Sequence, residues 1–238
     1  MRNLRFFYSK FANLKLRYAK TSPKRFLAYL RQKGVKIGEE IWFFHDLKSI
    51  SIDTSRPSLV EIGSHVRINK NFTLLTHDFS TFILKEKYDE FLASSGKVTI
   101  GNNVYFGRDC TVLKGVTIGD NCIIGYGSLV TRNIPANSVA IGRPAKVLMT
   151  LDEYRQKRKE RAIADAQEYA RSIQERFHRR PVPADFWEEF PLFVDRENIH
   201  DYPEIPIRKQ LGKSYDAWLS KHKRHYADFE AFMKEAGL

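Results

Sequence analysis

An apolar residue recurs every six positions along the middle of this chain. The step of six runs without interruption from Ile100 and also fits a stretch upstream of it. The residues are Ile62, Ile68, Leu74, Ile100, Phe106, Val112, Ile118, Ile124 and Val130. A six-residue period is typical of a parallel β-helix, in which each side of a prism supplies one short strand and one turn, and stacked coils bury a shared apolar axis. The period therefore predicts an all-β core of stacked coils.

The residues around each step favour the same fold over a chance alternation of valines in an ordinary sheet. Glycine or asparagine follows six of the apolar positions: Gly63, Asn69, Gly101, Gly107, Gly119 and Gly125. Both residue types tolerate positive φ, so we expect them at the sharp corners of the coils. Four positions after each apolar residue stands a side chain that we expect to point inward: Val66, Phe72, Val104, Cys110, Val116, Cys122, Ser128 and Ile134. The two cysteines are therefore expected to be buried small side chains, neither a disulfide nor reactive thiols.

The run from Gly101 to Val147 reads GNNVYFGRDCTVLKGVTIGDNCIIGYGSLVTRNIPANSVAIGRPAKV. Its ordered elements G-V-T-I-G-D-N, I-G-x-G-S-x-V-T, I-P and G-x-P-A-K-V resemble the end of the hexapeptide-repeat acetyltransferases, a family that includes galactoside, maltose and polysaccharide O-acetyltransferases. The resemblance covers roughly residues 35 to 148. It implies a left-handed parallel β-helix, a homotrimer, and acetyl-coenzyme A (acetyl-CoA) as cosubstrate in the groove between neighbouring subunits, with no metal ion.

The repeat is flanked by two different extensions. We expect a basic helical arm over residues 1–34, the β-helix over 35–148 with a loop at 75–99, and a helical, aromatic extension over 149–238. Residues 1 to 36 hold eleven Lys or Arg and no acid, so they supply nearly all of the formal net charge of +12. Apolar residues of the arm recur at three and four positions, which predicts an amphipathic helix: Leu4, Phe7, Phe11, Leu14 and Tyr18. Ser22-Pro23 is expected to begin a second helix that ends at Gly34.

Three roles are open to the arm: packing on the open end of the β-helix, contact with an anionic membrane surface, or binding of nucleic acid. We favour the first and keep membrane contact as an alternative. We expect no nucleic acid because no nucleic-acid-binding motif accompanies the charge. No apolar run reaches the roughly 20 residues that span a bilayer, and charges interrupt the N-terminal apolar positions, unlike a secretory signal. We therefore expect a cytoplasmic protein, with the inner face of the membrane as the alternative location.

The C-terminal extension begins with a helix signal. Thr150 and Glu153 have the spacing of a capping box, which predicts a helix to about Phe177. A stretch rich in proline and aromatic residues follows over 181–206, and a second helical region starts at Ser214. We expect this extension to be packed. Trp187 or Trp218 would offer an aromatic platform for a saccharide, although burial is the commoner role of such a residue.

The repeat stops at Leu74 and resumes at Ile100, a gap of 26 that is not a multiple of six, so a loop must leave the coils. The loop opens with LLTHDFST, which puts His77 just past the last in-phase residue. The family resemblance implies that His77 is the general base. A sugar hydroxyl ionises far above neutral pH, so a base must remove its proton as it attacks the thioester, and imidazole is the side chain best matched to that step. We expect direct transfer without a covalent acyl-enzyme.

Other site residues are also implied by the resemblance. Asn69 and Asn71 precede the base by one coil and are expected, with Asp78, to contact the acceptor. Asp78 could instead orient the imidazole, although adjacent side chains in an extended segment point opposite ways. Coenzyme contacts are expected at Tyr105, Arg108, Gly125, Tyr126, Gly127, Thr131, Arg132, Arg143 and Lys146. Arginine and lysine suit the phosphates of coenzyme A, whereas Tyr105 and Tyr126 replace the more usual tryptophan and alanine.

These residues lead to an expected function and three alternatives. The expected function is acetyl-CoA-dependent transfer of an acetyl group to a sugar hydroxyl, in the assembly of a surface polysaccharide. The same scaffold supports an amino-sugar N-acetyltransferase. A zinc protein resembling the γ-type carbonic anhydrases would need three histidines, and the spacing of His45, His65 and His77 in the repeats does not resemble that site. A scaffold without activity is the remaining alternative.

Overall fold

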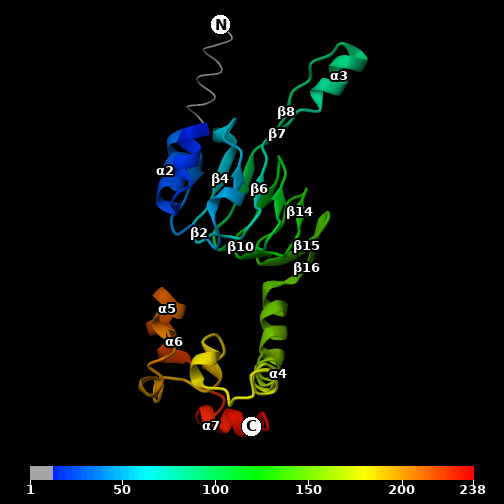
Figure 1. The fold of residues 1–238 in the computed structure, drawn as a ribbon. Helices are drawn as coiled ribbons and strands as arrows, with labels where there is room; N and C mark the ends of the chain where they lie inside the picture. Colours follow the sequence, from blue (N-terminus) through cyan, green and yellow to red (C-terminus); the bar gives the residue numbers. More distant parts are fainter. Residues whose placement is uncertain (1–12) are drawn as a thin grey trace. The chain divides into compact units, whose positions relative to one another are not determined.

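The structure is a computed structural model that describes residues 13–238 (Figure 1). The chain forms two compact units, with the division between Tyr154 and Arg155. The first unit contains the strands, and the second is built from helices and short helical turns. Leu4, Phe7 and Phe11 of the predicted N-terminal helix lie outside the described residues.

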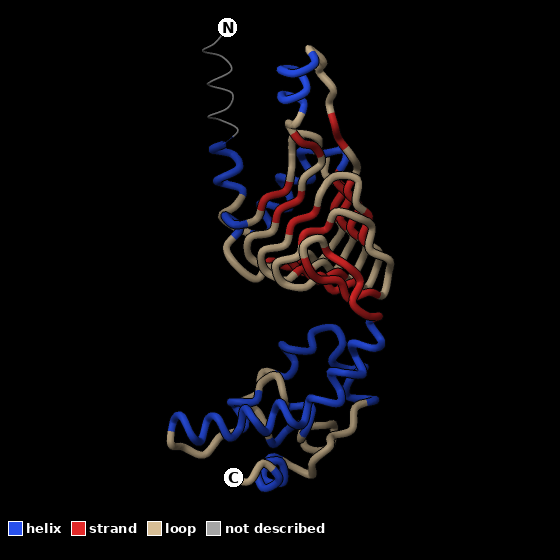
Figure 2. The backbone as a smooth tube through the Cα atoms, turned by 90° about the vertical axis from the view of Figure 1, so that its right-hand side faces the viewer, coloured by secondary structure: helices blue, strands red, loops and turns tan. Residues whose placement is uncertain are grey.

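Short strands of the first unit stack into three sheets, one on each side of a triangular prism (Figures 1 and 2). Each coil visits sheets A, B and C in turn. Sheet A contains β1 (Lys36–Ile37), β4 (Val60–Ile62), β9 (Val98–Ile100) and β12 (Thr117–Ile118). Sheet B contains β2 (Trp42–Phe43), β5 (Arg67–Ile68), β10 (Val104–Phe106), β13 (Cys122–Ile124), β15 (Ser138–Gly142) and β16 (Ala145–Thr150). Sheet C contains β3 (Ser51–Ile52), β6 (Thr73–Leu74), β11 (Thr111–Val112) and β14 (Leu129–Val130). All strand pairs within these three sheets are parallel except β15 with β16.

The register confirms the six-residue repeat. Ile62, Ile100 and Ile118 stand in line across sheet A, and the other two sheets align their apolar residues in the same way. These side chains, and all eight residues from Val66 to Ile134 that were predicted to point inward, are buried. Fully burying one such aliphatic or phenyl side chain is worth about 1.5–3 kcal/mol, so the aligned column is the main source of stability for the coils.

The predicted reason for the glycines was wrong. Gly63, Gly101, Gly107, Gly119 and Gly125 do not have positive φ. A Cβ at Gly101 would instead lie 2.8 Å from the backbone nitrogen of the next coil, so the glycine is needed because adjacent coils stack closely. Positive φ occurs two positions after each of these glycines and after Asn69, at His65, Asn71, Asn103, Asp109, Asn121 and Gly127. Gly115 and Asn137 have positive φ in the same unit, and most of these residue types tolerate this conformation.

Helix α2 (Pro23–Lys33) closes the N-terminal end of the β-helix. Ser22 caps it by accepting a hydrogen bond from the amide of Arg25, and Gly34 ends it with a φ of 102°, as predicted. Phe26 and Leu30 are buried in the same core as the coils, and the ring centroid of Phe26 lies 5.8 Å from that of Phe43. The packing role expected of the arm is therefore confirmed for α2.

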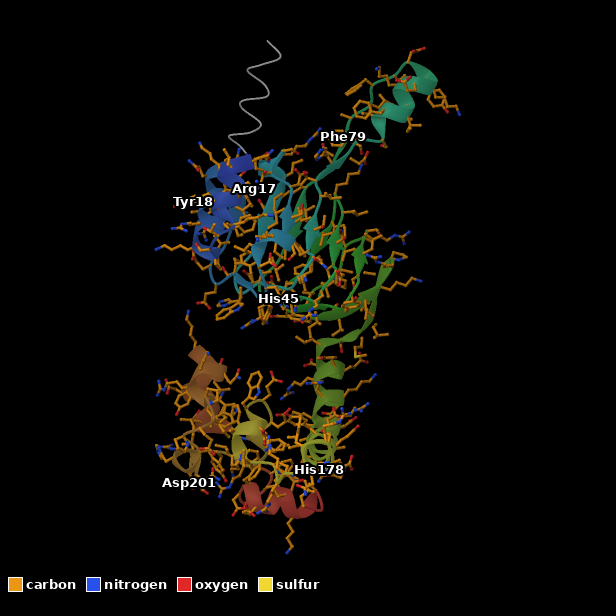
Figure 3. The ribbon with its side chains drawn as sticks, in the orientation of Figure 1. Arg17, Tyr18, His45, Phe79, His178 and Asp201 are labelled. Carbon is orange, nitrogen blue, oxygen red and sulfur yellow. The ribbon has the colours of Figure 1, made fainter. Side chains whose placement is uncertain are left out.

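The preceding helix, over residues 13–19, packs by a different face from the one predicted. Ala19 is buried and Leu16 packs against the core. Leu14 and Tyr18, which the predicted stripe would bury, are 59% and 63% exposed. Arg17 and Tyr18 are labelled on this helix in Figure 3. Packing of the stripe on the β-helix was therefore wrong for its described part, because Leu16 and Ala19 make the contact with the core instead.

A long loop leaves the prism after sheet C and returns at β9, as the gap in the repeat predicted. Its stem is the antiparallel pair β7 (His77–Asp78) and β8 (Ser94–Ser95), and its tip carries α3 (Thr81–Tyr88). Figure 1 shows the loop projecting from the coils.

The second unit has its own aromatic core. Long helix α4 (Leu151–Phe177) begins at the predicted capping box, where Thr150 Oγ1 accepts from the amide of Glu153 at 3.2 Å and Glu153 Oε2 accepts from that of Thr150 at 2.7 Å. Three short helices follow: α5 (Ile207–Leu211), α6 (Tyr215–Lys221) and α7 (Phe229–Glu235). Short 3-10 turns, among them η3 (Pro183–Phe186) and η4 (Phe190–Leu192), carry buried phenylalanines. Trp187 is exposed, whereas Trp218 packs on Phe190 and His222. None of the described helices has the length and apolar character needed to cross a bilayer.

Candidate active site

His77 lies where the chain turns from sheet C into the long loop. Leu74 ends β6, Thr76 is fully buried, and His77 begins β7. On the preceding coil Ile52 pairs with Leu74, and the amide of the next residue, Asp53, donates to the Leu74 carbonyl at 3.0 Å. The stacking of two coils therefore brings Asp53 beside His77, although 24 positions separate them in the sequence.

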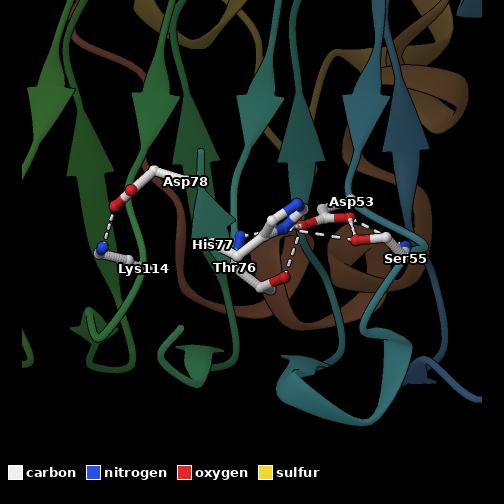
Figure 4. A network of polar contacts seen from close by, with 6 residues as sticks. All are labelled: Asp53, Ser55, Thr76, His77, Asp78 and Lys114. Atoms are coloured by element: carbon white, nitrogen blue, oxygen red, sulfur yellow. Dashed lines mark hydrogen bonds and ion pairs between the residues drawn. The ribbon is translucent and has the colours of Figure 1, made fainter. Parts of the chain in front are cut away.

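A carboxylate holds the imidazole in place (Figure 4). His77 Nδ1 lies 2.7 Å from Asp53 Oδ2 and 3.3 Å from the hydroxyl of Ser55. The imidazole and the carboxylate side chains are only 14% and 7% exposed. The other oxygen of Asp53, Oδ1, accepts from the amide and hydroxyl of Ser55 at 2.9 and 2.6 Å, while Oδ2 also accepts from the amide and hydroxyl of Thr76.

These contacts decide which nitrogen of His77 is free. Burial acts to raise the pKa of Asp53, but hydrogen bonds from Ser55, Thr76 and His77 together hold that pKa well below its usual range. The carboxylate is therefore ionised and can only accept, so the proton of the neutral imidazole sits on Nδ1. The lone pair is then on Nε2, which is the arrangement of a general base oriented by an acid.

Asp53 was not predicted from the sequence. The repeat is irregular around it, because nine positions separate Phe43 from Ile52 and ten separate Ile52 from Ile62. A search in steps of six therefore ends before this coil is reached. The signal that was available is a polar D-x-S directly after an apolar residue, and only the pairing of β3 with β6 shows that it faces the histidine.

Asp78, predicted to contact the acceptor or orient the base, points the other way (Figure 4). It forms an ion pair with Lys114 and accepts from the amide of Ser80 at 2.9 Å. The hydrogen bond from Lys114, followed by those from Ser80, lowers the pKa of Asp78. Lys114 also donates to the hydroxyl of Ser94 on the opposite arm of the loop. These contacts, with the bond from the Gly96 amide to the Thr76 carbonyl at 2.9 Å, fix the loop stem to the coils.

An aromatic pair adjoins the histidine. The ring centroid of Phe79 lies 5.0 Å from that of His77 with an interplanar angle of 79°. Phe82, in the first turn of α3, stacks on Phe79 with centroids 6.1 Å apart. Figure 3 labels Phe79 on the projecting loop.

Most of the predicted coenzyme residues lie at a different corner of the same chain, between sheets B and C. Arg143 Nε donates to the Gly127 carbonyl at 2.8 Å, and Arg108 Nη2 lies 3.2 Å from His45 Nε2. Gly125 and Tyr126 adjoin them in the turn after β13, and the Tyr126 ring is exposed. The width of sheet C separates this corner from His77.

The remaining predicted residues divide between the two corners and sheet B. Asn69 donates to the hydroxyl of Tyr105 at 3.3 Å and Asn71 to Asp109 at 2.7 Å, so neither is near His77 within one chain. Thr131 and Arg132 follow β14, on the side of sheet C where His77 lies, two coils further along. Lys146 is on β16, paired with Ile141.

Metal and thiol chemistry find little support in the described part of the chain. No group of three or more His, Cys, Asp or Glu side chains within residues 13–238 could hold a metal ion, and His65 lies 3.0 Å from a carboxylate oxygen of Glu40. Cys110 and Cys122 are buried free thiols, as predicted. Burial raises the pKa of both, that of Cys110 to about 11.

Comparison with known proteins identifies the repeat. A family model described as bacterial transferase hexapeptide (six repeats) matches residues 97–132. Protein CapG of Staphylococcus aureus is 36% identical over 132 residues, which cover 54% of this chain and 73% of CapG. Galactoside O-acetyltransferase of Escherichia coli is 42% identical over 94 residues, which cover 40% of this chain but only 45% of that enzyme.

Among solved structures, a maltose O-acetyltransferase from Clostridium difficile matches with a TM-score of 0.43 and 25% identity, over 59% of this chain and 84% of that one. The predicted fold class, a left-handed parallel β-helix with helical extensions, is confirmed. Because CapG is matched over nearly three quarters of its length at 36% identity, the chain belongs to the bacterial hexapeptide-repeat transferase family.

Proposed function

We propose that this protein is an acetyl-CoA-dependent O-acetyltransferase that modifies a hydroxyl group of a sugar. The observation that carries the proposal is the buried Asp53–His77 pair, which leaves Nε2 of the imidazole as a proton acceptor at the mouth of the loop. The name of the galactoside O-acetyltransferase, a relative that this chain covers only in part, supports a sugar as the acceptor.

The chemistry follows from this geometry. Nε2 of His77 removes the proton of the acceptor hydroxyl while the oxygen attacks the thioester carbonyl. The carbon–sulfur bond then breaks, the acetyl group stays on the sugar oxygen, and the imidazolium returns its proton to the leaving thiolate of coenzyme A. Asp53 stabilises the imidazolium between the two steps. Neither described cysteine can carry the acetyl group, since Cys110 and Cys122 are buried and their pKa values are raised.

The proposed site for acetyl-CoA joins two copies of the chain. The corner with Arg108, Tyr126 and Arg143 offers guanidinium groups for phosphates and an exposed ring for the pantetheine arm. Because sheet C separates this corner from His77 in one chain, a neighbouring copy would have to supply it. We therefore propose that Tyr105, Gly125, Gly127, Thr131, Arg132 and Lys146 complete the coenzyme contacts within such an assembly, while Asn69, Asn71 and Asp78 stay predicted acceptor contacts.

A homotrimer would provide that neighbour. The outer face of sheet B carries exposed apolar residues, Trp42, Phe44, Tyr105 and Ile141, whereas the outward residues of β1, β4, β9 and β12 in sheet A are polar or charged. Exposed apolar surface of this kind marks an interaction site. Light scattering should give the mass of three chains, and Trp42→Asp should lower it. A monomer with full activity would contradict the assembly.

The amino-sugar alternative has less support. A neutral amine is already nucleophilic, so an oriented base such as the Asp53–His77 pair is of greater use to an alcohol.

For location, we propose the cytoplasm with peripheral contact at the membrane through the arm. Leu14 and Tyr18 are exposed beside Lys15 and Arg17, which suits an anionic surface. Flotation with anionic vesicles should be reduced by Leu14→Asp, and unchanged flotation would reject the contact.

Release of free thiol from acetyl-CoA tests the proposed function. With a panel of methyl hexopyranosides and amino sugars, the wild-type protein should release thiol only when an acceptor is present. His77→Ala should lower kcat by about 10²–10⁴, with the melting temperature as a check on folding. If no acceptor stimulates release, or if His77→Ala retains the rate, the proposal is wrong.

A further inference from the structure

We propose that Phe79 and Phe82 form the acceptor-binding surface of this enzyme, on which the C–H face of a pyranose ring stacks. The inference rests on the proposed function and adds to it the residues that select the acceptor. The two phenylalanines are called the aromatic shelf below.

The shelf lies at the reaction centre. The Phe79 ring contacts the imidazole of His77 at a centroid distance of 5.0 Å, and Phe82 extends the surface with its ring plane only 23° from that of Phe79. A hydroxyl that gives its proton to Nε2 must come within hydrogen-bond distance of that nitrogen. The six-membered ring that carries the hydroxyl then extends far enough to lie over the shelf.

Exposure combined with stacking on each other sets these two rings apart from the other described rings of the same unit. Phe79 and Phe82 are 67% and 53% exposed, whereas Phe26, Phe72 and Phe106 are at most 1% exposed. Two stacked phenyl rings left in water are a favourable contact surface for an apolar partner. A site that combines aromatic walls with a few fixed polar groups is typical of small-molecule recognition.

The shelf is also held in position. Asp78, between His77 and Phe79 in the sequence, is bound by Lys114 on the next coil and by Ser80. Lys114 reaches across to Ser94, so both arms of the stem are tied to one corner of the β-helix. A surface fixed before binding loses less conformational entropy when the ligand arrives.

The chemistry of the shelf favours a pyranose over other hydroxyl compounds. A pyranose presents polar hydroxyls at its rim and C–H groups on its faces, so one face can stack while a rim hydroxyl points to Nε2. An acyclic alditol carries similar hydroxyls but no rigid C–H face. The shelf should therefore discriminate between these two classes of acceptor.

The test compares Phe79→Ala and Phe82→Ala with the wild type. Both should raise KM for methyl hexopyranosides roughly tenfold, leave KM for acetyl-CoA unchanged, and have little effect on alditols. Phe79→Tyr keeps an aromatic ring, so its KM for methyl hexopyranosides should stay close to the wild-type value. The matched control is Phe91→Ala, since Phe91 is 66% exposed on the same loop and has no aromatic partner among the described residues.

The failure of this inference can be told from that of the proposed function. If the wild-type protein is active and Phe79→Ala leaves KM for pyranosides unchanged, or raises it equally for alditols, the shelf is not the acceptor surface. A lower oligomer mass for Phe79→Ala would overturn the inference too, because a second copy would then cover the shelf. If the wild-type protein is inactive, saturation-transfer NMR decides: contact of pyranoside C–H protons with the protein that Phe79→Ala abolishes would still support stacking, and its absence would reject it.

Discussion

Replacing Asp53 with asparagine tests the link between the packing of the coils and the chemistry of His77. The substitution keeps the shape of the side chain but removes its charge and one of its two acceptor atoms. In the folded protein the two carboxylate oxygens accept from five donors: the amide and hydroxyl of Ser55, the amide and hydroxyl of Thr76, and Nδ1 of His77. An amide NH₂ group cannot accept a hydrogen bond. At least two of the five donors therefore lose their acceptor, whichever way the new side chain is turned.

The magnitude follows from that count. A buried donor left without a partner costs about 1–3 kcal/mol, and the hydroxyls can turn to reduce the loss, so we expect Asp53→Asn to lower the free energy of unfolding by about 2–3 kcal/mol. The effect on catalysis should be larger. Without an ionised acceptor at Nδ1 the imidazole loses both its tautomer and the stabilisation of its charged form, so kcat should fall by about 10²–10⁴, while KM for acetyl-CoA stays close to the wild-type value.

The pH dependence of stability provides an independent assay. The pKa of Asp53 is lower in the folded protein than in the unfolded chain, so its ionised form stabilises the folded state above the unfolded pKa of about 4, and this contribution is lost as the pH falls through the folded value. The carboxamide of the Asp53→Asn variant does not titrate. The difference in melting temperature between the wild type and the variant should therefore be largest near neutral pH and should narrow below about pH 4.

Urea unfolding at pH 7 and pH 3.5, together with thiol-release kinetics, measures both effects. The reasoning is refuted if Asp53→Asn retains kcat within a factor of three while the fold is intact. It is also refuted if the stability difference does not change with pH, because Asp53 would then not be the ionised partner of His77. Ser55→Ala is the milder companion variant: it removes one hydroxyl donor and should lower stability by about 1 kcal/mol with a smaller loss of kcat.

Three further predictions concern the packing of the first unit. Gly101→Ala places a Cβ 2.8 Å from the backbone of the next coil and should lower the free energy of unfolding by about 3 kcal/mol. Gly115→Asn, at an open position with a φ of 79°, should be tolerated. Similar melting curves for the two variants would contradict the argument that Gly101 is needed for close stacking of the coils. Thr81→Val should leave the free energy of unfolding unchanged or raise it by about 1 kcal/mol, since the buried Thr81 hydroxyl has no hydrogen-bond partner in the described part of the chain. A clear loss of stability on urea unfolding would contradict this. Cys110 and Cys122 should react with iodoacetamide at pH 8 only after unfolding, because burial raises their pKa values. Alkylation of either cysteine in the folded protein, detected by mass spectrometry, would contradict this.

The repeat made most of the β-helix predictable. Each coil buries its apolar residue at the same place, so Ile100 and Ile118 fix the register whatever the solvent-facing residues are. The corners were harder, because Gly and Asn satisfy two different demands: Gly101 avoids a clash between coils, whereas Asn103 adopts positive φ. A composition pattern does not separate the two. The exposed stripe of Leu14 and Tyr18 was mispredicted for a similar reason, since helical spacing gives an apolar face but not the surface that covers it.

The candidate site could be predicted only in part. His77 was found because it opens the loop at an interruption of the period, where the family resemblance implies a general base. Asp53 was missed because it stands at a second interruption, on the coil before. Both interruptions leave the prism between sheet C and sheet A: residues 53–59 connect β3 to β4, and residues 75–97 connect β6 to β9. A regular coil leaves few positions there, since only residues 113–116 connect β11 to β12. Two longer, irregular connections stacked on one another add positions at this corner, and the backbone pairing of Ile52 with Leu74 then aligns an acid with a base. In a repeat of this kind, the corner at which successive coils both depart from the period is therefore the place to expect the chemistry.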